Sequence, residues 1–450
     1  MKTVCITSFQ GLISRILEGG VVDVLLEDGD VRIVILVPKF KLEYFKKILG
    51  QKERVYIEGV EENQLSRIAR LFHAISFMLL DTHTMRLIRR SPRDYSGFLR
   101  YIATQGFARL FGHSRTVRKF FRFLNYYFSG KPLFEDIFQR YAPVCVLSMD
   151  IKHPLDTKLV IEAKKKGITT VGMVRSWDYL TAKGVIRVQP EKMIVHNSII
   201  AKEAMQYADM EERDIEIIGM PHFDAYVNEK RSSKKEFFNR IGVPENKKLI
   251  ILAVPGNKFS DIDSDFYDIF CRTVEEDVFA EPVHILVRVP PGDSVPGGEG
   301  LCDALSFDIP GVQFGDFHRK ANEMSYNDVL HLANVLHFAD VLVTTSSTLI
   351  IDAAVFDVPT VYLGFDGYKR RPYIKSIRHY FDYDHAKHII SANGGRMANS
   401  PGELIAHVNH YLKHPEDEQA GRKKIVDEQC FLLDGNASKR LAQFVRAQLP

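Results

Sequence analysis

The chain has 450 residues, of which 45% are hydrophobic and 26% are charged, and its net charge is +3. This length exceeds one ordinary hydrophobic core, so two domains of about 200 residues each are expected. The composition excludes a largely disordered chain. Because no apolar run is long enough for a secretion signal or a membrane-spanning helix, we expect a cytoplasmic protein.

Short β-rich apolar runs alternate with helical patterns along the chain, which is typical of parallel sheets covered by helices. In the first half the expected strands are TVCIT, VRIVILV, RVYIEGV, VCVLSM, TTVGMV, KMIVHN and IEIIG. A long helical insertion, from about residue 64 to 141, interrupts this rhythm.

Part of the insertion, residues 85–131, combines positive charge with aromatic side chains: eleven Arg and Lys residues oppose the single acid Asp94. Such helices suit an anionic membrane surface, because cations bind headgroup phosphates while rings enter the acyl boundary. The residues that we assign to contact with membrane or acceptor are Arg115, Arg118, Lys119 and Arg122. An ordinary amphipathic helix pair, with aromatics in a core and solvated arginines, is the alternative. Nucleic acid is not expected, since no nucleic-acid module surrounds the segment.

A charged stretch after Tyr226 indicates a linker and a short helix, which places a domain boundary near residues 226–246. A second series of strands follows: LIILAV, HILVRV, VQFG, VLVTT and TVYLG. We therefore predict an α/β fold with two Rossmann-like, doubly wound parallel-sheet domains. The predicted parts are residues 1–230, residues 231–415 and a pair of C-terminal helices within residues 416–450.

Five cysteines, odd in number and never in a C-x-x-C pair, predict neither a disulfide framework nor a zinc site. The acidic run DIDSD, residues 261–265, precedes a helical pattern and is interpreted as a capping cluster, so no metal is predicted.

A hydroxyl-rich turn follows the strand VLVTT and consists of Ser346, Ser347 and Thr348. Ligands bind at the carboxyl ends of strands in open parallel sheets. The start of the next helix would offer free N–H groups and a positive dipole end to a phosphate. Asp352, about one turn further on, is placed to accept from a ribose hydroxyl. Ordinary helix capping explains the same residues without a ligand.

Four segments, in order, resemble GT-B-fold glycosyltransferases related to the nonhydrolysing UDP-GlcNAc 2-epimerases and the CDP-glycerol glycerophosphotransferases. They are RSWDYLTAKG, IEIIGMPHFDAY, ADVLVTTSSTLIIDAAVFDVPTVYLGFD and FLLDGNASKRLAQFV. The likeness spans about residues 145–445. It implies a second domain that holds a nucleotide-linked donor, a first domain that carries the acceptor, reaction in the cleft between them, and last helices that cross back.

The resemblance also assigns donor-binding residues. The hydroxyl-rich turn would bind the donor diphosphate and Asp352 the ribose, while the remaining assignments are Gly219, Pro221, His222 and Arg288. Arg288 corresponds to the basic residue of the family's R/K-x-H-P loop. The histidine of that loop is absent here, which suggests either a donor other than CDP-glycerol or a relative that uses other residues. A hinge-packing role is the alternative for His222. Solvated loop charges are the alternative to a phosphate contact for His318, Arg319 and Lys320.

Transfer of a sugar needs a stabilised leaving group and, with inversion, a base for the acceptor hydroxyl. The candidate bases are Asp178, Asp150, His153 and Asp156. Asp178 leads because SWD follows the strand TTVGMV, and capping of the next element is its alternative. Trp177, the only tryptophan, either stacks on a sugar or is buried.

No G-x-G-x-x-G after the first strand, Walker pattern or G-x-S-x-G elbow is present, so dehydrogenase, P-loop and hydrolase readings are unsupported. We predict a metal-independent glycosyltransferase that needs no cofactor and is peripheral on the inner membrane face. It moves a sugar or an alditol phosphate from a nucleotide-linked donor to a bacterial surface-polysaccharide acceptor, such as capsule or lipopolysaccharide, or to a lipid-linked one. A UDP-GlcNAc 2-epimerase-like isomerase and a non-catalytic nucleotide-binding scaffold are the alternatives.

Overall fold

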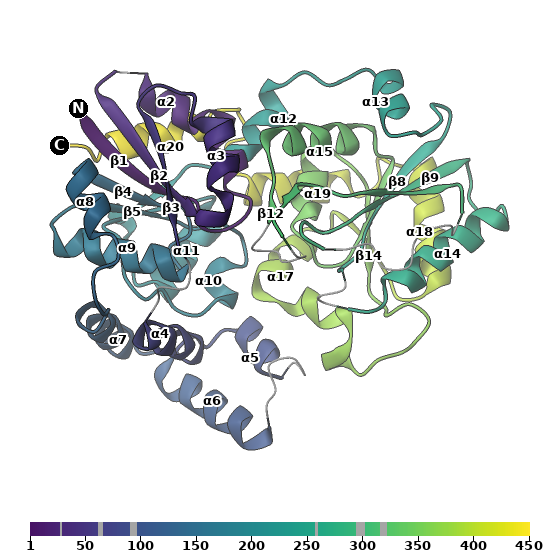
Figure 1. Ribbon diagram of the computed structural model, residues 1–450. Coiled ribbons are helices and arrows are strands. Elements are labelled where there is room, and N and C mark those ends of the chain that lie inside the picture. The colour runs from purple at the N-terminus through teal and green to yellow at the C-terminus, as the bar shows by residue number, and fades with distance from the viewer. Residues whose placement is uncertain (28, 62–65, 91–96, 257–259, 294–301, 316–321) are drawn as a thin grey trace. The chain divides into compact units, whose positions relative to one another are not determined.

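The computed structural model describes residues 1–450 except 28, 62–65, 91–96, 257–259, 294–301 and 316–321. The chain divides into two compact units: unit 1 is residues 1–227 with 431–450, and unit 2 is residues 228–430. Each unit is built on its own parallel sheet, flanked by helices (Figure 1). The predicted α/β class with two doubly wound sheets is confirmed.

The sheet of unit 1 has seven parallel strands in the order β3-β2-β1-β4-β5-β6-β7 within the described residues. Their bounds are β1 Lys2–Thr7, β2 Val31–Pro38, β3 Val55–Val60, β4 Cys145–Ser148, β5 Thr169–Met173, β6 Lys192–Val195 and β7 Ile215–Ile217. All seven predicted runs form these strands. The order reverses between β1 and β4, and ligands of doubly wound sheets bind beside such a switch point.

Short helices and the chain's last helix cover this sheet (Figure 1). They are α1 Ser14–Ile16, α2 Val22–Leu26, α3 Leu42–Leu49, α9 Pro154–Lys165, α10 Tyr179–Ala182, α11 Ser198–Tyr207, α12 Asp224–Asn228 and α20 Ala437–Arg446. Leu441, Ala442 and Val445 of α20 are buried in the same core as Val4 and Ile6 of β1. Residues from the two ends of the sequence therefore share one hydrophobic core.

Two segments that carried the sequence resemblance bind each other in unit 1. The carboxylate of Asp224 accepts hydrogen bonds from the backbone N–H groups of Ala437 (2.9 Å) and Ser438 (2.7 Å). These groups lie in the first turn of α20, where no intrahelical partner exists. Arg440 Nε donates to the carbonyl of Ile218 at 2.8 Å. Asp224 and Arg440 thus hold the last helix against the end of β7.

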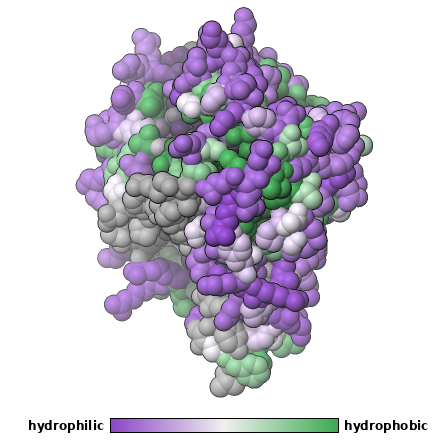
Figure 2. All heavy atoms as spheres, turned by 90° about the vertical axis from the view of Figure 1, so that its right-hand side faces the viewer, coloured by the Kyte–Doolittle hydropathy of each residue, from purple (hydrophilic) through white to green (hydrophobic). Residues whose placement is uncertain are grey.

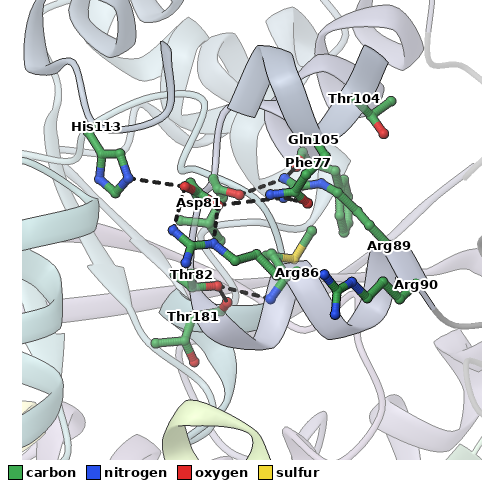
Figure 3. Close-up of polar contacts among 12 residues, drawn as sticks. Phe77, Asp81, Thr82, Arg86, Arg89, Arg90, Thr104, Gln105, His113 and Thr181 are labelled. Carbon is green, nitrogen blue, oxygen red and sulfur yellow. Dashed lines mark hydrogen bonds and ion pairs between the residues drawn. The ribbon is translucent and has the colours of Figure 1, made fainter. Parts of the chain in front are cut away.

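Five helices form the insertion between β3 and β4: α4 Arg67–Met78, α5 His83–Arg90, α6 Phe98–Phe111, α7 Arg115–Tyr127 and α8 Glu135–Tyr141. The buried carboxylate of Asp81, between α4 and α5, binds a residue of α5 and a residue of the turn between α6 and α7 (Figure 3). It accepts two bonds from Arg86, at 2.9 and 2.8 Å, and lies 3.1 Å from His113 Nε2. Arg89 donates to the carbonyls of Phe77, near the end of α4, and of Leu80, which follows that helix. This cluster fixes the turn between α4 and α5.

Arg118 and Arg122 do not lie on an exposed surface. Both side chains are buried and bind the carboxylate of Asp209, with N–O distances of 2.6 and 2.7 Å. Neither is available to a lipid headgroup, because a buried guanidinium is stable only beside its partner. Arg115 and Lys119, in contrast, are exposed. Of the four cations predicted to contact a membrane, only Arg115 and Lys119 are therefore exposed enough to do so.

Many aromatic side chains of the insertion are exposed, although Phe72 and Phe121 are buried. An "apolar face", exposed on α4, α6 and α7, consists of Ile68, Leu71, Phe98, Ile102, Leu110, Phe111, Phe120, Phe123, Tyr127 and Phe128. Figure 2 shows one face of the molecule on which hydrophilic residues predominate, with hydrophobic ones at its lower end, where α6 lies in Figure 1. Neither the predicted membrane surface nor the ordinary amphipathic helix pair fits this segment entirely, because Arg118 and Arg122 are buried while many aromatic side chains are exposed. No helix in the described residues is long and apolar enough to cross a membrane.

The sheet of unit 2 has six parallel strands in the order β10-β9-β8-β13-β14-β15 within the described residues. Their bounds are β8 Lys248–Ala253, β9 Val283–Arg288, β10 Leu305–Asp308, β13 Val341–Thr344, β14 Thr360–Leu363 and β15 Gly395–Ala398. The run VQFG was expected within this series, but its strand β11, Val312–Gln313, pairs outside the sheet with β12, Asn322–Glu323, in antiparallel fashion. The sequence did not predict β10 or β15.

The helices of unit 2 end with α19. They are α13 Lys234–Arg240, α14 Asp263–Glu275, α15 Tyr326–Phe338, α16 Leu349–Val355, α17 Asp384–Ile390, α18 Pro401–Lys413 and α19 Gln419–Gln429. The segment 416–450 therefore divides, with α19 in unit 2 and α20 in unit 1. Cys271 of α14 and Cys302 form a disulfide, which the sequence did not indicate. Packing brings together two cysteines that lie 31 residues apart.

Candidate functional site

Polar side chains gather where β4 and β5 of unit 1 end. Asp150 follows β4 and binds Arg175, which follows β5, with a distance of 3.0 Å between Oδ2 and Nε. Lys152 is buried beside them, and its Nζ donates to the carbonyl of Tyr179 at 2.6 Å. The carboxyl ends of adjacent parallel strands meet at one edge, which is why residues 25 apart in the chain come together here.

Burial at this edge lowers the pKa of Lys152. Burial and the nearby Lys183 lower this pKa from 10.5 to about 7, while Asp178 and Asp150 oppose the change. Both predicted carboxylates therefore lie close enough to act on one ammonium group. The structure thus brings Asp150 and Asp178 into one site.

Asp178 stands at the N-cap position of α10, but its side chain makes no capping hydrogen bond. Its carboxylate accepts from the hydroxyl of Ser176 and forms an ion pair with Lys183, with 3.0 Å between Nζ and Oδ2. The capping alternative is therefore not observed. The carboxylate is already engaged with one donor and one cation.

His153 begins α9 and is almost fully buried. Its ring stacks on Phe9, with 5.6 Å between centroids, and its Nδ1 lies 3.5 Å from Oδ2 of Asp156. Oδ1 of Asp156 accepts hydrogen bonds from the hydroxyls of Thr7 and Ser148. Burial raises the pKa of Asp156. Thr7 and Ser148 end β1 and β4, the two strands at the switch point of the sheet.

Trp177 and two histidines lie deeper at the same edge. Trp177 is 6% exposed and packs against His196, with 5.5 Å between ring centroids. Burial, the alternative to stacking on a sugar, is thus what the structure shows. Burial lowers the pKa of His196 to about 4 and also lowers that of His222, to which Arg15 contributes. Sequence reasoning did not single out His196, which directly follows β6, or Lys152, which lies in the segment between β4 and α9.

Gly219 and Pro221 lie between β7 and α12. Gly219 has φ +83°, a left-handed conformation that glycine adopts without strain. Pro221 opens a single helical turn that contains the buried His222. Their predicted contact with the nucleotide stays a prediction.

The hydroxyl-rich turn of unit 2 follows β13, beside β8 at that sheet's switch point. Ser346, Ser347 and Thr348 are half-buried, and Ser347 Oγ accepts from the N–H of Leu349 at 3.2 Å. Thr348 occupies the N-cap position of α16 without a side-chain capping bond. Asp352, in the first turn, is buried. The predicted strand, turn and helix are present, and the hydroxyl of Ser347 already accepts a hydrogen bond from the backbone.

Arg288 ends β9 and is buried against Asp308 of β10. Asp308 also lies 3.1 Å from His331 Nε2. Although burial opposes the change, His331 and Arg288 lower the pKa of Asp308 to about 2. Arg288 therefore has a protein partner, and its role toward a phosphate stays a prediction. The predicted contacts His318, Arg319 and Lys320 lie outside the described residues.

Metal-ligating side chains are not clustered in the part of the chain that the structure describes: no group of three or more His, Cys, Asp or Glu is placed to hold an ion. The run DIDSD begins α14, and Asp263 Oδ2 accepts from the N–H of Gly256 at 3.1 Å.

Comparison with known proteins adds a family match to part of the chain and a fold. Residues 313–447 match the model of the CDP-glycerol:poly(glycerophosphate) glycerophosphotransferase family. A search of curated proteins finds no match. Three solved structures are similar at low sequence identity. UDP-GlcNAc 2-epimerase from Neisseria meningitidis bound to UDP-GlcNAc has a TM-score of 0.57 and 10% sequence identity, and the match covers 99% of this chain and 100% of that one. The glycosyltransferase of kitacinnamycin has a TM-score of 0.53 and 12% identity, with 100% of this chain and 99% of that one covered. The wall teichoic acid polymerase TagF has a TM-score of 0.50 and 14% identity, with 99% of this chain and 88% of that one covered.

These matches confirm the resemblance seen in the sequence. The similar structures show the fold, which is of the GT-B type along essentially the whole chain. The family match lies in the C-terminal third and contains the hydroxyl-rich turn and Asp352. Match and fold together support a glycosyltransferase.

Proposed function

We propose that this GT-B-fold chain, whose residues 313–447 match a glycerophosphotransferase family, transfers a sugar or an alditol phosphate from a nucleotide-linked donor. The acceptor is a bacterial surface polysaccharide or a lipid-linked precursor. The observation that carries the proposal is that the family match includes the turn after β13 and covers residues 313–430 of unit 2, which is built on a doubly wound sheet.

The donor belongs to unit 2 in this proposal. The half-buried hydroxyls of Ser346, Ser347 and Thr348 and the N–H groups at the start of α16 bind the diphosphate, and Asp352 accepts from the ribose. Hydroxyl and N–H donors neutralise charge on the leaving phosphate. Gly219, Pro221, His222 and Arg288 remain further donor-binding candidates.

The acceptor belongs to unit 1, whose polar edge contains Asp150, His153 and Asp178. One of these side chains takes the acceptor's proton as the new bond forms. No cofactor or metal ion is part of the proposal.

We also propose that the protein works at the inner face of the membrane. Its apolar face on α4, α6 and α7 is exposed, and Arg115 and Lys119 are exposed on α7. Aromatic rings beside cations suit the boundary between headgroups and acyl chains. Such a surface would keep the enzyme near a lipid-linked acceptor.

Nucleotide binding tests the function directly. In a thermal-shift screen against UDP, CDP, CMP, GDP and dTDP, one nucleotide is expected to raise the melting temperature, because a ligand at about 100 times its Kd stabilises the folded state by about 2.7 kcal/mol. Asp352→Asn with Ser347→Ala is expected to abolish that shift. Glu276→Gln, an exposed acid of unit 2, is the matched control and should keep it.

The outcomes separate the three functions. Transfer from the matching nucleotide-sugar supports the proposal. Conversion of free UDP-GlcNAc to its 2-epimer would replace it with an isomerase. A protein that binds nucleotide and neither transfers nor isomerises is a scaffold, and a protein that binds none contradicts the donor site.

A further inference from the structure

The disulfide of unit 2 joins α14 to the segment that precedes β10. Cys271 lies in α14, and Cys302 comes shortly before Leu305, the first residue of β10. Cys271 is buried, whereas Cys302 is only half-buried. Cys302 is therefore the partner that a thiol from solution reaches first.

The strand β10 is held from few sides. It is the edge strand of its sheet and pairs only with β9 in the described residues, and all its residues are half-buried. From α14 it receives the disulfide and a ring contact between Tyr267 and Phe307, with 5.5 Å between centroids. Tyr267 and Cys271 are four residues apart and thus lie on one face of α14. The disulfide ties an edge strand, through the segment before it, to the helix packed against it.

The last residue of β10, Asp308, binds Arg288, which lies opposite it in the parallel register of β9. The same carboxylate lies 3.1 Å from His331 Nε2. Arg288 is a candidate for contact with the donor's phosphates, but here a carboxylate neutralises its charge. That carboxylate would also repel an anion that approaches. How firmly β10 is held therefore decides whether Arg288 is free for a phosphate.

The proposed function places this disulfide in a reducing environment. A protein at the inner face of a bacterial membrane faces the cytosol, where disulfides are usually transient, catalytic or redox-sensing. Once the bond is broken, the two sulfurs need more room than a bonded pair. Reduction therefore separates Cys302 from Cys271 and loosens the start of β10.

We propose that the disulfide between Cys271 and Cys302 is a reversible redox site that regulates binding of the donor. The oxidised form fixes β10 and keeps Asp308 on Arg288. The reduced form loosens β10 and frees Arg288 for a phosphate of the donor. This inference rests on the proposed function.

The reductant is a dithiol. One of its thiolates attacks Sγ of Cys302, the S–S bond breaks, and Cys271 leaves as a thiolate that takes up a proton. The second thiol of the reductant then attacks the mixed disulfide and displaces Cys302, which takes up the other proton. The reductant ends as a disulfide, and the protein has gained two electrons and two protons. A small disulfide such as oxidised glutathione reverses these steps.

Counting thiols tests the redox site by itself. The native full-length chain is treated with oxidised glutathione or with dithiothreitol, then denatured, alkylated and weighed by mass spectrometry. We expect three alkylated cysteines after oxidation, which are Cys5, Cys145 and Cys430, and all five after reduction. A disulfide that survives dithiothreitol in the native protein, or a pair of thiols that does not re-form it, would overturn the proposal.

Nucleotide affinity in the two redox states tests the regulation. The reduced wild type is expected to bind the nucleotide identified by the thermal-shift screen at least about fivefold more tightly than the oxidised one, which is the lower end for coupled sites. Cys302→Ser should bind like the reduced protein under both conditions. Asp308→Asn removes the competing carboxylate, so its affinity should not depend on the redox state. Cys145→Ala, which removes a free cysteine of unit 1, is the matched control and should keep the full response.

The results distinguish this inference from the proposed function. If the wild type binds a nucleotide equally in both states, or more tightly when oxidised, the inference is overturned while the function stands. If neither state binds any of the five nucleotides, the function itself fails and the regulation fails with it. The comparison of the two wild-type forms needs no substitution, so a variant that does not fold leaves this test intact. A redox response that persists in Asp308→Asn would overturn the role of Asp308.

Discussion

Several ionisable side chains at the polar edge of unit 1 are buried, and burial changes the pH at which they take up protons. His196 is the clearest case, because burial lowers its pKa from 6.5 to about 4. Between these values the unfolded chain binds a proton that the folded chain does not. The stability of unit 1 therefore falls as pH drops from 6.5 toward 4.

Trp177 offers a direct measurement of this effect, since it is the only tryptophan and packs on His196. In urea unfolding followed by tryptophan fluorescence, His196→Gln is expected to lose less stability between pH 6.5 and 4.5 than the wild type. Some loss should remain, because the pKa of His222 is lowered as well. Equal losses in both proteins would contradict the buried neutral imidazole.

The candidate site residues that could be predicted from the sequence are those that follow the end of a predicted strand. Asp150, His153 and Asp178 follow predicted strands, and adjacent parallel strands bring their loops together. Their partners could not be predicted, because the 3.5 Å approach of His153 to Asp156 depends on rotamers and on Thr7, far away in the sequence. Arg288 shows the same limit, since its partner Asp308 belongs to a strand that the sequence did not reveal.

Among the elements, α7 shows how one helix serves two purposes. Arg118, Arg122 and Asn125 are buried, while Lys119, Phe123 and other side chains of the opposite face are exposed. Helical spacing separates these faces in the sequence. It does not reveal which face is buried, because Asp209, the partner of both arginines, lies 91 and 87 residues further along.

The exposed side of this helix predicts membrane binding. The wild type should sediment with vesicles of phosphatidylglycerol at low salt and much less with phosphatidylcholine, because cations and rings act together. Phe120→Ser with Phe123→Ser is expected to reduce sedimentation, whereas Val278→Ser, an exposed apolar residue of unit 2, should not. Equal sedimentation of all three proteins, or none at all, would contradict the proposed membrane surface.

Over the whole molecule, both sheets could be predicted from alternating strands and helices. The strands β10 and β15 were missed because LSFD and GRMA are short and only half apolar, so their pairing with β9 and β14 decides their structure. The two units could be inferred from length, but the discontinuity of unit 1 needs the structure, since helical patterns alone do not show where α20 packs.

That discontinuity leads to a stability prediction. Leu441 of α20 is fully buried in the core of unit 1, and Leu441→Ala is expected to cost about 2–5 kcal/mol. Leu432→Ala, about half exposed in the same terminal segment, should cost less than about 0.5 kcal/mol. Urea unfolding measured by Trp177 fluorescence reports on unit 1. Similar values for the two variants would show that α20 contributes little to this core.

The same arrangement has a consequence during synthesis on the ribosome. The first seven strands of unit 1 are translated before unit 2, yet the core of unit 1 also needs Leu441, Ala442 and Val445. All of unit 2 is translated in between, so unit 2 is able to fold while unit 1 still lacks one helix. Synthesis of unit 1 therefore starts before that of unit 2 and ends after it.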